Sequence, residues 1–425
     1  MKQIELLKNK LMVLFYMFMG VCMSLNAQTE NASIRISYSD GKDLLLSQNL
    51  NLLAEYYNIE IATAEIEQAK LWNNPLFVWN AEMYSMAQNR YFNFNNQKLI
   101  QLEYAFSFSG KRINAIRQAN LGKEIAELAF SDVMRGMVSE FSNLYFSLNA
   151  LSEKERIYIT ILEQFENVIE LSKLKENLGV VSESDVLRLR TEYLSLQSVL
   201  NGIRNERYQI EAQVKSLLNL SSDVSIETTR VNFGMLGDLP IGALIDSAKI
   251  YRPDYLIAER NLSLSELVYK GEKKEAYPMI NLGYQPLDQG SNHVRPYVGM
   301  VFEMSVPIFD RNQGNIHSAK VGIEQKKYQL EYARKDLENN VVSKYLQLKN
   351  TKGIYDQYTE AMRLEMNELS ENARLNFDKR NISLVEYIDF QRAYIDYQMN
   401  WIEATSNYFQ SINQIHFAVG KEIQF

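Results

Sequence analysis

Few side chains in this sequence combine the residue types and the spacing that catalysis requires. The chain has 425 residues, and its three histidines, His293, His317 and His416, lie far apart in the sequence. It contains no Ser/His/Asp arrangement for acyl transfer, no glycine-rich phosphate loop and no H-E-x-x-H motif. We therefore expect no enzymatic activity and no cofactor.

A metal site is not expected either. His317 follows a predicted strand-to-helix junction and His293 lies in a predicted polar loop. Met300 and Met304 are better explained as one face of a strand than as copper ligands. The single cysteine, Cys22, excludes a disulfide framework and a zinc site built on thiolates.

Composition and charge restrict the class of protein further. The chain is 46% hydrophobic and 23% charged, with a formal net charge of −7. That balance excludes a mostly disordered chain and a basic nucleic-acid-binding protein. After residue 27, no apolar run approaches the roughly 18 residues of a membrane-spanning helix. These averages resemble a soluble, acidic, helical protein, but they leave 26 tyrosines and 19 phenylalanines to be explained.

The first 27 residues have the pattern of a secretory signal peptide. Three early lysines precede an apolar stretch from Leu11 to Met23, and the small residue Ala27 follows it. The stretch is too short for a membrane anchor, which needs about 20 residues. Val21 stands where a lipoprotein signal needs a small residue, so lipidation of Cys22 is not expected. Cleavage after Ala27 would leave a mature chain that works outside the cytoplasm.

The rest of the sequence consists of two similar halves. Pro75 and Pro278 each precede a predicted strand, 203 residues apart (278 − 75). The segment 178–185 matches 379–386 with a shift of 201 (379 − 178). A repeat of this length indicates a duplicated unit rather than a solenoid, whose period is roughly 20–50 residues.

Each half predicts a shorter helix, two strands and then two long helices. The shorter helices, 50–70 and 255–274, end before a proline. Apolar residues then recur every three or four positions, as in helices that pack in coiled coils. An unbroken helix over 112–179 would be roughly 100 Å long. Because 76–239 and 308–425 lack proline, we expect uninterrupted helical rods in both halves.

A capping box marks the reversal between the two long helices of each half. Ser182 is followed three residues later by Asp185, and Ser383 is followed by Glu386. Both fit the S-x-x-[DE] pattern that begins a helix. Gly179 is suited to ending the preceding helix. Each half therefore predicts an antiparallel helical hairpin with an acidic residue near its tip.

The extended segments alternate apolar and polar residues, as strands with two different faces do. The segments 76–84 and 279–285 are the first strands of each pair, and 101–109 and 297–308 are the second. One face of the second strands is apolar and consists of Leu102, Tyr104, Phe106, Phe108, Val298, Met300, Phe302 and Met304. The other face is polar and includes Gln101, Glu103, Ser107 and Glu303.

Alternation alone also fits a soluble sheet packed on helices. The export signal, the aromatic residues gathered in and beside the strands, and the long helices favour strands in an outer membrane. A spanning strand needs ~9–11 residues, and an open sheet of four strands cannot span because every backbone group in lipid must be paired. The smallest bacterial barrels have about 8 strands, so several chains must share one barrel. Two chains would supply eight strands (2 × 4) and three would supply twelve (3 × 4).

With these elements in order, the mature chain resembles the TolC family of bacterial outer-membrane efflux proteins. The duplicated order of helix, strand pair and hairpin, and the tips with their Gly, Val, Ser and Asp residues, are features of that family. Residues 306–315, V-P-I-F-D-R-N-Q-G-N, are similar to a signature of its CzcC-like, heavy-metal branch. The first-half counterpart, Phe108 to Arg112, is also typical.

The resemblance implies a mostly α-helical homotrimer with a small β part. Duplicated hairpins would form a periplasmic α-barrel, and four strands per chain would join a shared twelve-stranded transmembrane β-barrel. The implied role is a passive channel-tunnel in the outer membrane, extending into the periplasm, that exports metal cations or drugs in a tripartite efflux system. The implied partners are a periplasmic adaptor (membrane fusion protein), an inner-membrane resistance-nodulation-division pump and outer-membrane lipid, with no nucleic acid. The alternative is a soluble periplasmic coiled-coil scaffold or adaptor, although an adaptor would carry one hairpin rather than two.

The pattern and the resemblance together divide the chain into nine parts. They are the signal peptide (1–27), an N-terminal helical segment (28–74), transmembrane β-hairpin 1 (75–110), long helical hairpin 1 (111–220), an equatorial linker (221–250), the helix of the second repeat (251–277), transmembrane β-hairpin 2 (278–310), long helical hairpin 2 (311–420) and a C-terminal tail (421–425).

The resemblance also implies a gate at the hairpin tips. The family closes its tunnel with an acidic pair on the second hairpin, and Glu386 and Asp389 fall on those positions, with Asp185 as the first-half equivalent. Acidic side chains around a narrow pore attract cations and raise one another's pKa. Capping alone is the alternative role for Asp185 and Glu386, and the two roles are compatible. Lys379 and Arg380 either pair with these acids to hold the gate closed or are simply solvated.

Overall fold

The computed structural model describes residues 33–81, 83–86, 89–91, 98–229, 240–288 and 295–422. The predicted signal peptide, with Cys22, and His293 lie outside the described residues, as do parts of the predicted segments 28–74, 75–110, 221–250, 278–310 and 421–425. Contacts between residues divide the chain into two compact units. One unit contains Glu55–Ser131 and Pro253–Asp336, and the other contains Asp132–Arg252 with the residues before Glu55 and after Asp336.

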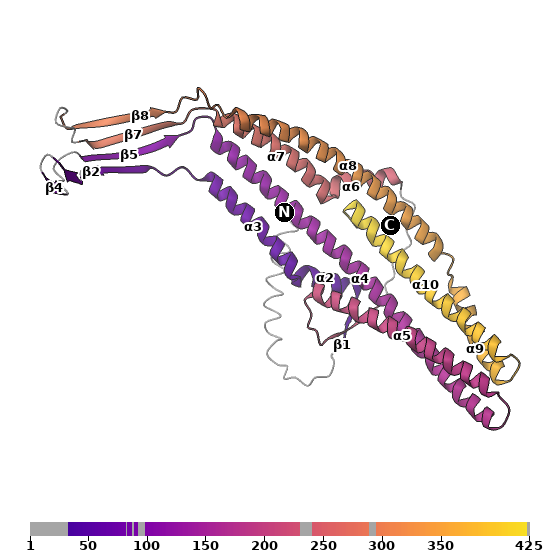
Figure 1. The fold of residues 1–425 in the computed structure, drawn as a ribbon. Coiled ribbons are helices and arrows are strands. Elements are labelled where there is room, and N and C mark those ends of the chain that lie inside the picture. Colours follow the sequence, from indigo (N-terminus) through magenta and orange to yellow (C-terminus); the bar gives the residue numbers. More distant parts are fainter. Residues whose placement is uncertain are drawn as a thin grey trace. The chain divides into compact units, whose positions relative to one another are not determined.

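Helices occur in the same order in both halves of the chain (Figure 1). The first half contains α2 (Tyr38–Gln48), α3 (Leu50–Lys70), α4 (Lys111–Asn177) and α5 (Glu183–Leu218). The second half contains α6 (Ile241–Tyr251), α7 (Pro253–Glu275), α8 (Gln313–Tyr355), α9 (Glu360–Asp378) and α10 (Leu384–Val419). The predicted helix 50–70 coincides with α3, and α4 begins and ends within two residues of the predicted 112–179.

Matching turns at the helix ends show the internal duplication in the backbone. Gly179 after α4 and Arg380 after α9 have positive φ angles of 72° and 63°, and they lie 201 residues apart (380 − 179). Asn219 after α5 and Gly420 after α10 have φ angles of 53° and 78° at the same spacing (420 − 219 = 201). In all four turns the N–H of the following residue bonds to the carbonyl five residues earlier, which closes a Schellman motif.

The prediction of an uninterrupted rod was wrong for the second half. Helix α8 ends at Tyr355 and α9 begins at Glu360, so the helix is broken over 356–359. The hydroxyl of Thr359 accepts a hydrogen bond from the backbone N–H of Met362 at 3.2 Å and so caps α9. A threonine cap starts a new helix without any proline, so the lack of proline in 308–425 did not reveal the break.

Four strands form one antiparallel sheet in the order β2–β5–β7–β8. Their bounds are β2 (Leu76–Ala81), β5 (Lys98–Phe106), β7 (Ile280–Asp288) and β8 (Tyr297–Met304). The central pairing of β5 with β7 joins the two halves of the repeat, whereas β2 and β8 each pair with one neighbour among the described strands. A two-residue ladder, β3 (Tyr84–Ser85) with β4 (Arg90–Tyr91), lies between β2 and β5 in the sequence.

The strand bounds differ from the predicted ones by a few residues. The predicted strand 101–109 is shifted to 98–106, and the predicted 297–308 ends at Met304. Around Pro286, the pairing of β7 is irregular with both neighbouring strands. The register with β5 shifts between Ile100 and Leu102, and the register with β8 shifts between Gln285 and Asp288. Proline has no N–H to donate to a ladder, so a central strand tolerates it only at such a bulge.

A small parallel sheet that the sequence did not predict joins β1 (Ser33–Ile36) to β6 (Ser225–Thr228). Ile36 and Ile226 are buried in a core with residues of α2, α4 and α5. The hydroxyl of Tyr145 on α4 donates a hydrogen bond to the carbonyl of Ile36 at 3.0 Å. The beginning of the described chain and the segment between the two halves are therefore held against the same part of α4.

The two hairpins share one apolar core. Its members come from α4, α5, α9 and α10 and include Tyr158, Phe165, Leu189, Leu196, Ala373, Tyr387, Ile388 and Ile395. Tyr158 and Phe165 of α4, Leu189 and Leu196 of α5, and Ile388 and Ile395 of α10 are each seven residues apart, so one side of each of these three helices is buried. Near the tips of the hairpins, α4 lies beside α5 and α9 lies beside α10, and this core packs between them (Figure 1).

Candidate functional site

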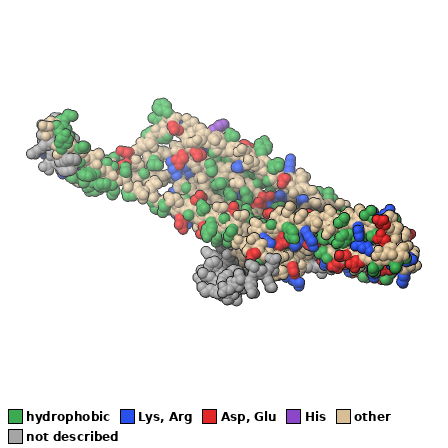
Figure 2. Space-filling view, turned by 60° about the horizontal axis from the view of Figure 1, so that its bottom comes forward, with side chains coloured by type: hydrophobic (Ala, Val, Ile, Leu, Met, Phe, Trp, Pro, Cys, Tyr) green, Lys and Arg blue, Asp and Glu red, His purple; other side chains and the backbone are tan. Residues whose placement is uncertain are grey.

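The four-stranded sheet exposes an apolar face. Residues that pair across strands lie on the same face, and Leu102 of β5 pairs with Phe77 of β2 and Tyr284 of β7. In β8, Phe302 pairs with Leu282 of β7. Figure 2 shows hydrophobic side chains gathered over this end of the chain. A face of this kind needs an apolar environment, because contact between so many apolar side chains and water is unfavourable.

The eight residues predicted to face lipid differ in exposure. Five are exposed in β5 and β8, namely Leu102, Val298, Met300, Phe302 and Met304. Tyr104 and Phe106 are half-buried because their rings contact each other, with centroids 4.6 Å apart. Phe108 is exposed, but it lies two residues beyond the end of β5.

The opposite face of the sheet is polar, and two of its side chains form a hydrogen bond with each other. The side-chain amide of Gln285 donates a hydrogen bond to the side-chain oxygen of Gln101 at 2.8 Å, and both side chains are buried. Glu103 lies opposite Gly283, and Glu303 lies opposite Asn281. The structure therefore brings three of the four predicted lumen residues onto one face. Ser107 lies just beyond β5 and is exposed.

The hairpin tips hold the predicted acidic residues in caps. The hydroxyl of Ser182 donates to the Asp185 carboxylate at 2.7 Å and accepts from the Asp185 backbone N–H at 3.2 Å. In the second tip, the Ser383 backbone N–H donates to the Glu386 carboxylate at 2.7 Å, and the Glu386 N–H donates to the Ser383 hydroxyl at 3.3 Å. The predicted capping box is thus complete in the second hairpin.

This capping changes the acidity of Glu386. The hydrogen bond from the Ser383 backbone, followed by the one with the Ser383 side chain, lowers the pKa of the Glu386 carboxyl below its ordinary value. Glu386 and Asp389 are both exposed, whereas Asp185 is half-buried. Figure 2 shows acidic and basic side chains intermixed over the tips. The second tip therefore keeps an ionised carboxylate that also remains open to solvent.

The basic residues beside the second tip lie apart from the predicted acids in the single chain. Within the described part of the chain, neither Lys379 nor Arg380 makes an ion pair with Asp185, Glu386 or Asp389. Both basic side chains are exposed. The positive φ of Arg380 instead shows that this residue closes the turn after α9.

A different ion pair links the two hairpins. Arg392 of α10 donates two hydrogen bonds to the carboxylate of Glu192 of α5, at 3.0 and 2.6 Å. The sequence analysis missed this pair. Because the repeat shift is 201 and the pair is 200 residues apart, the two residues occupy nearly equivalent positions of their hairpins. A search for opposite charges at the repeat spacing could have found it.

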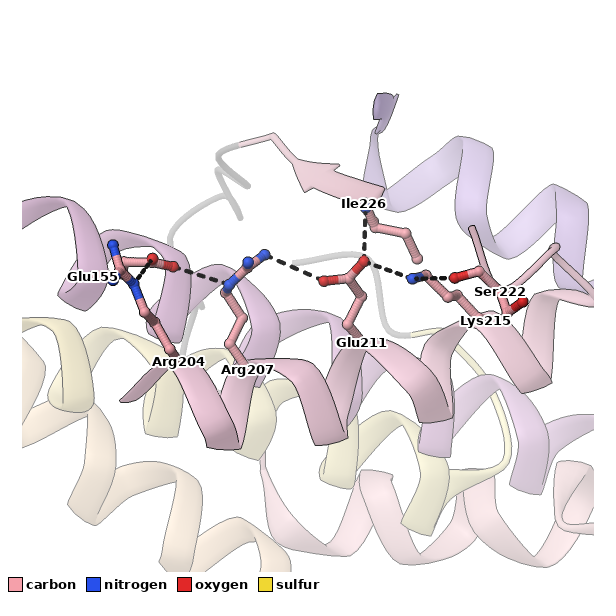
Figure 3. A network of polar contacts seen from close by, with 7 residues as sticks. All are labelled: Glu155, Arg204, Arg207, Glu211, Lys215, Ser222 and Ile226. Atoms are coloured by element: carbon pink, nitrogen blue, oxygen red, sulfur yellow. Dashed lines mark hydrogen bonds and ion pairs between the residues drawn. The ribbon is translucent and has the colours of Figure 1, made fainter. Parts of the chain in front are cut away.

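A line of charged side chains fixes β6 against α5 (Figure 3). Glu155 of α4 lies 2.7 Å from Arg204 and 2.9 Å from Arg207 of α5. Arg207 and Lys215 flank the carboxylate of Glu211, at 3.2 and 2.9 Å. The same carboxylate accepts the backbone N–H of Ile226 in β6 at 3.1 Å. Glu211 is buried, so the charges around it compensate for the loss of water.

Comparison with known proteins places these features in a family. Residues 42–220 match the family described as "Outer membrane efflux protein". This match agrees with the resemblance of the sequence to the TolC family of outer membrane efflux proteins. It is 19% identical over 352 residues to the cobalt-zinc-cadmium resistance protein CzcC of Cupriavidus metallidurans, covering 82% of each chain. It is also 21% identical over 213 residues to the alkaline protease secretion protein AprF of Pseudomonas aeruginosa, covering 48% of this chain and 43% of AprF.

Solved structures share the fold of this outer membrane efflux protein. The CmeC outer membrane channel of Campylobacter jejuni aligns with a TM-score of 0.74 and 16% identity, over 91% of this chain and 86% of CmeC. The open state of the MtrE outer membrane channel of Neisseria gonorrhoeae aligns with a TM-score of 0.71 and 13% identity, over 94% of each chain. CusC aligns with a TM-score of 0.72 and 15% identity, over 94% of this chain and 96% of CusC.

The family confirms the predicted function and location. The protein is a channel of a tripartite efflux system, located in the outer membrane and extending into the periplasm, and it is a passive duct rather than an enzyme. Its partners therefore include an adaptor and a pump, and a soluble scaffold is not favoured. Among the described residues, no helix has both the length and the hydropathy needed to cross a bilayer. The same residues contain no group of His, Cys, Asp and Glu suited to holding a metal ion.

Proposed function

We propose that three copies of this efflux protein form one channel, in which the four-stranded sheets close into a twelve-stranded barrel. Among the described strands, β2 and β8 each pair on one side only, and these open edges support the assembly. In lipid, every backbone N–H and C=O must be paired, so each edge requires a partner strand. Pairing β8 of one copy with β2 of the next satisfies all edges once the ring closes. A homotrimer also gives the threefold symmetry that a ring of identical tips requires.

In this barrel the apolar face contacts lipid and the polar face lines the lumen. The exposed Met300 and Phe302 lie on the first face, and Glu103 and Glu303 lie on the second. Charged side chains facing lipid are destabilising, by about 2–4 kcal/mol for Lys or Arg at the middle of the bilayer and by less for Glu, so the membrane favours the orientation that keeps both glutamates in the lumen. Glu103→Leu should therefore change the conductance, whereas Met300→Lys should impair insertion.

The tips of both hairpins form the periplasmic gate in this proposal. Glu386 and Asp389 follow the turn after α9, and Asp185 occupies the matching position of the first hairpin. Three copies would bring nine carboxylates (3 × 3) near one axis. The carboxylates of such a ring attract cations and repel one another. The ring therefore keeps the pore narrow only while bound cations or neighbouring basic side chains compensate its negative charge. The Glu192–Arg392 pair, rather than Lys379 or Arg380, would tie the hairpins in this closed arrangement.

The first tip offers apolar surface for the adaptor. Leu174, Leu178 and Leu187 are each more than 60% exposed in the single chain, beside the turn that joins α4 to α5. Isolated exposed leucines are common, but three around one turn indicate a contact surface. We propose that the α-helices of the periplasmic adaptor dock on these leucines, and that the inner-membrane pump is of the resistance-nodulation-division class.

Metal cations are the cargo that the relatives favour. CzcC is named for resistance to cobalt, zinc and cadmium, and it matches this chain over 82% of both lengths. The P-I-F-D-R-N-Q-G-N segment, 307–315, points to the same branch. Deleting the gene should lower tolerance to zinc, cobalt or cadmium more than tolerance to dyes and antibiotics. The reverse pattern would assign the duct to drugs.

Planar-bilayer recording of the purified full-length channel tests the gate. Replacing Glu386 and Asp389 by alanine should raise the conductance and weaken block by divalent cations, because the ring loses six of its nine carboxylates. A matched variant replaces Glu365 and Glu368 by alanine. These two exposed acids lie on α9 farther from the tip, so this variant should conduct like the wild type. Unchanged block in the tip variant would remove these residues from the gate. Native mass spectrometry of the same sample tests the trimer, and a monomer there would refute the shared barrel.

A further inference from the structure

Four short segments join the strands of the sheet to α3, α4, α7 and α8, and all of them belong to one compact unit (Figure 1). We call them the junction, and they are residues 70–75, 107–113, 270–279 and 305–313. Hydrogen bonds connect its parts. The Arg112 guanidinium donates to the carbonyl of Lys70 at 3.0 Å, and the Lys274 ammonium donates to the carbonyl of Gly110 at 2.9 Å. Segments that are distant in the sequence therefore share one surface beside the sheet.

The junction is basic, although the chain as a whole is acidic. It contains seven basic residues and three acidic ones, whereas the chain has a formal net charge of −7. The three acids already have partners. Glu275 pairs with Lys111 at 2.7 Å. The side-chain amide of Asn312 donates to the Glu272 carboxylate at 2.6 Å, and its backbone N–H donates to the Asp310 carboxylate at 2.8 Å. The acids of the junction therefore leave most of its positive charge uncompensated.

Most of these bases remain available to an anion. Six of the seven form no ion pair with any described residue, namely Lys70, Arg112, Lys270, Lys273, Lys274 and Arg311. Lys70, Lys273 and Arg311 are also exposed. Arg311 donates from Nε to the carbonyl of Ile308 at 3.1 Å, and its two terminal nitrogens have no hydrogen-bond partner among the described residues. These nitrogens and the two lysine ammonium groups can each donate to a ligand.

Stabilisation of the helices does not explain the pattern. Lys70 and Lys273 lie in the last turns of α3 and α7, where the helix dipole favours a base. Lys111 and Arg112 begin α4, and Arg311 comes two residues before α8, where the dipole favours acids instead. The first turns of α4 and α8 contain no acid. Lys70 and Lys273 are 203 residues apart (273 − 70), and Lys111 and Arg311 are 200 apart (311 − 111). Both halves of the repeat therefore place bases at the same points of the junction.

Exposed aromatic side chains lie among the bases. Trp72 is 70% exposed, and the guanidinium of Arg112 lies 4.3 Å from the centroid of its ring. Phe309 is 91% exposed and comes two residues before Arg311, and Tyr277 is also exposed. Aromatic rings beside lysine and arginine are typical of the layer in which a bilayer meets water, because the rings reach the apolar region while the charges stay hydrated.

We propose that the junction binds the phosphate groups of anionic phospholipids in the leaflet that faces the periplasm. This inference rests on the proposed barrel, because it requires the strands to lie in the bilayer. The helices extend into the periplasm, so the junction lies at the periplasmic surface of the membrane. A phosphodiester accepts charge-assisted hydrogen bonds from Lys and Arg, and each base near an anionic surface adds attraction. A zwitterionic lipid binds more weakly, because its own ammonium group opposes the bases. In the closed ring, the junctions of the three copies form one belt.

Quenching of tryptophan fluorescence by brominated lipids tests the proposal on the full-length protein. The chain has three tryptophans, and replacing Trp79 and Trp401 by phenylalanine leaves Trp72 as the reporter at the junction. The protein is reconstituted in phosphatidylcholine vesicles that contain a rising fraction of dibrominated phosphatidylglycerol or dibrominated phosphatidylcholine. We expect an affinity for phosphatidylglycerol at least roughly fivefold higher than that for phosphatidylcholine. Equal quenching of Trp72 by the two brominated lipids would overturn the proposal.

Two triple variants show whether the bases of the junction cause the preference. The junction variant combines Lys70→Gln, Lys273→Gln and Arg311→Gln. The control variant removes the same charge from exposed positions of α5 and α8, and it combines Arg188→Gln, Lys335→Gln and Lys349→Gln. The preference should fall below roughly twofold in the junction variant and stay unchanged in the control variant. A preference that survives in the first variant, or that disappears in the second, would contradict the assignment.

A second reporter separates this inference from the barrel on which it rests. Trp79 is exposed on β2, on the same face as Phe77 two residues before it. When Trp79 is the only tryptophan, both brominated lipids should quench it. Quenching of Trp79 without a preference at Trp72 would overturn the phospholipid site alone, whereas no quenching of Trp79 would refute the barrel together with the site. Millimolar inorganic phosphate should leave the preference at Trp72 unchanged, and loss of the preference would assign the junction to soluble anions instead.

Discussion

Replacing Glu211 by glutamine should loosen the attachment of β6 to α5. The Glu211 carboxylate accepts hydrogen bonds from the Ile226 backbone and from Arg207, and it pairs with Lys215 at 2.9 Å. Only 6% of this side chain is exposed. Removing one partner of a buried ion pair costs about 3–5 kcal/mol. Glutamine keeps the size and one acceptor, Arg207 retains Glu155, and Lys215 retains a carbonyl oxygen, so we expect about 2 kcal/mol.

Hydrogen exchange measured by mass spectrometry isolates this local effect. A loss of about 2 kcal/mol corresponds to roughly thirty-fold faster exchange at the Ile226 amide, because that amide exchanges when β6 opens from α5. Glu206→Gln, an exposed acid on the same helix, is the matched control and should leave the exchange unchanged. If Glu211→Gln left the Ile226 amide as protected as in the wild type, the charged line in Figure 3 would not be what holds β6.

Further predictions concern the helix caps and one close contact. Gly420→Ala should destabilise the protein by about 1–3 kcal/mol, because its Cβ would lie 2.8 Å from the Tyr251 carbonyl at a φ of 78°. Gly242→Ala, with open space around it in α6, should instead stabilise by roughly 0.5–1 kcal/mol, and thermal unfolding scans compare the two. Ser383→Ala should cost about 1 kcal/mol at the start of α10, seen as faster amide exchange over 384–388 while the Ser182 tip is unaffected. The capping contribution of Glu386 should be present at neutral pH and down to its ordinary pKa of 4.5, and it should be lost as the pH falls through the lower pKa of the folded state. Exchange at this tip, corrected for the intrinsic rate, should therefore accelerate only in strong acid, and acceleration already near pH 6 would contradict the capping assignment.

Local signals in the sequence were sufficient for most of the helical architecture. The spacing of apolar residues located α3 and α4 within two residues, and the S-x-x-[DE] pattern located both hairpin tips. These signals act within a few residues of one another, through backbone hydrogen bonds and helix periodicity, so they survive without any knowledge of the tertiary structure. The break over 356–359 escaped because this segment contains neither proline nor glycine, and a single threonine does not by itself mark a helix start.

Contacts between distant segments needed the tertiary structure. The β1–β6 sheet pairs residues 192 apart, and the Glu192–Arg392 pair joins residues 200 apart. In both cases, the sequence around each partner contains no local pattern that identifies the other partner, because strand edges and surface charges are compatible with many partners. The cavity lined by Phe146 of α4, Tyr355 of α8 and Trp401 of α10 likewise forms only because three separate helices bring their rings to one place.

The sequence alone therefore determined the duplicated plan, the two hairpins with their acidic tips, and strands that alternate apolar and polar residues. It also carried the resemblance to the TolC family, since the order of the elements and the 306–315 segment are properties of the linear chain. Only the tertiary structure decided the strand order β2–β5–β7–β8 and the pairing of Gln101 with Gln285, and it placed β2 and β8 at the edges of the sheet among the described strands. The physical reason is range: caps and periodicity act over one helical turn, whereas strand order and buried charge pairs depend on which distant segments meet.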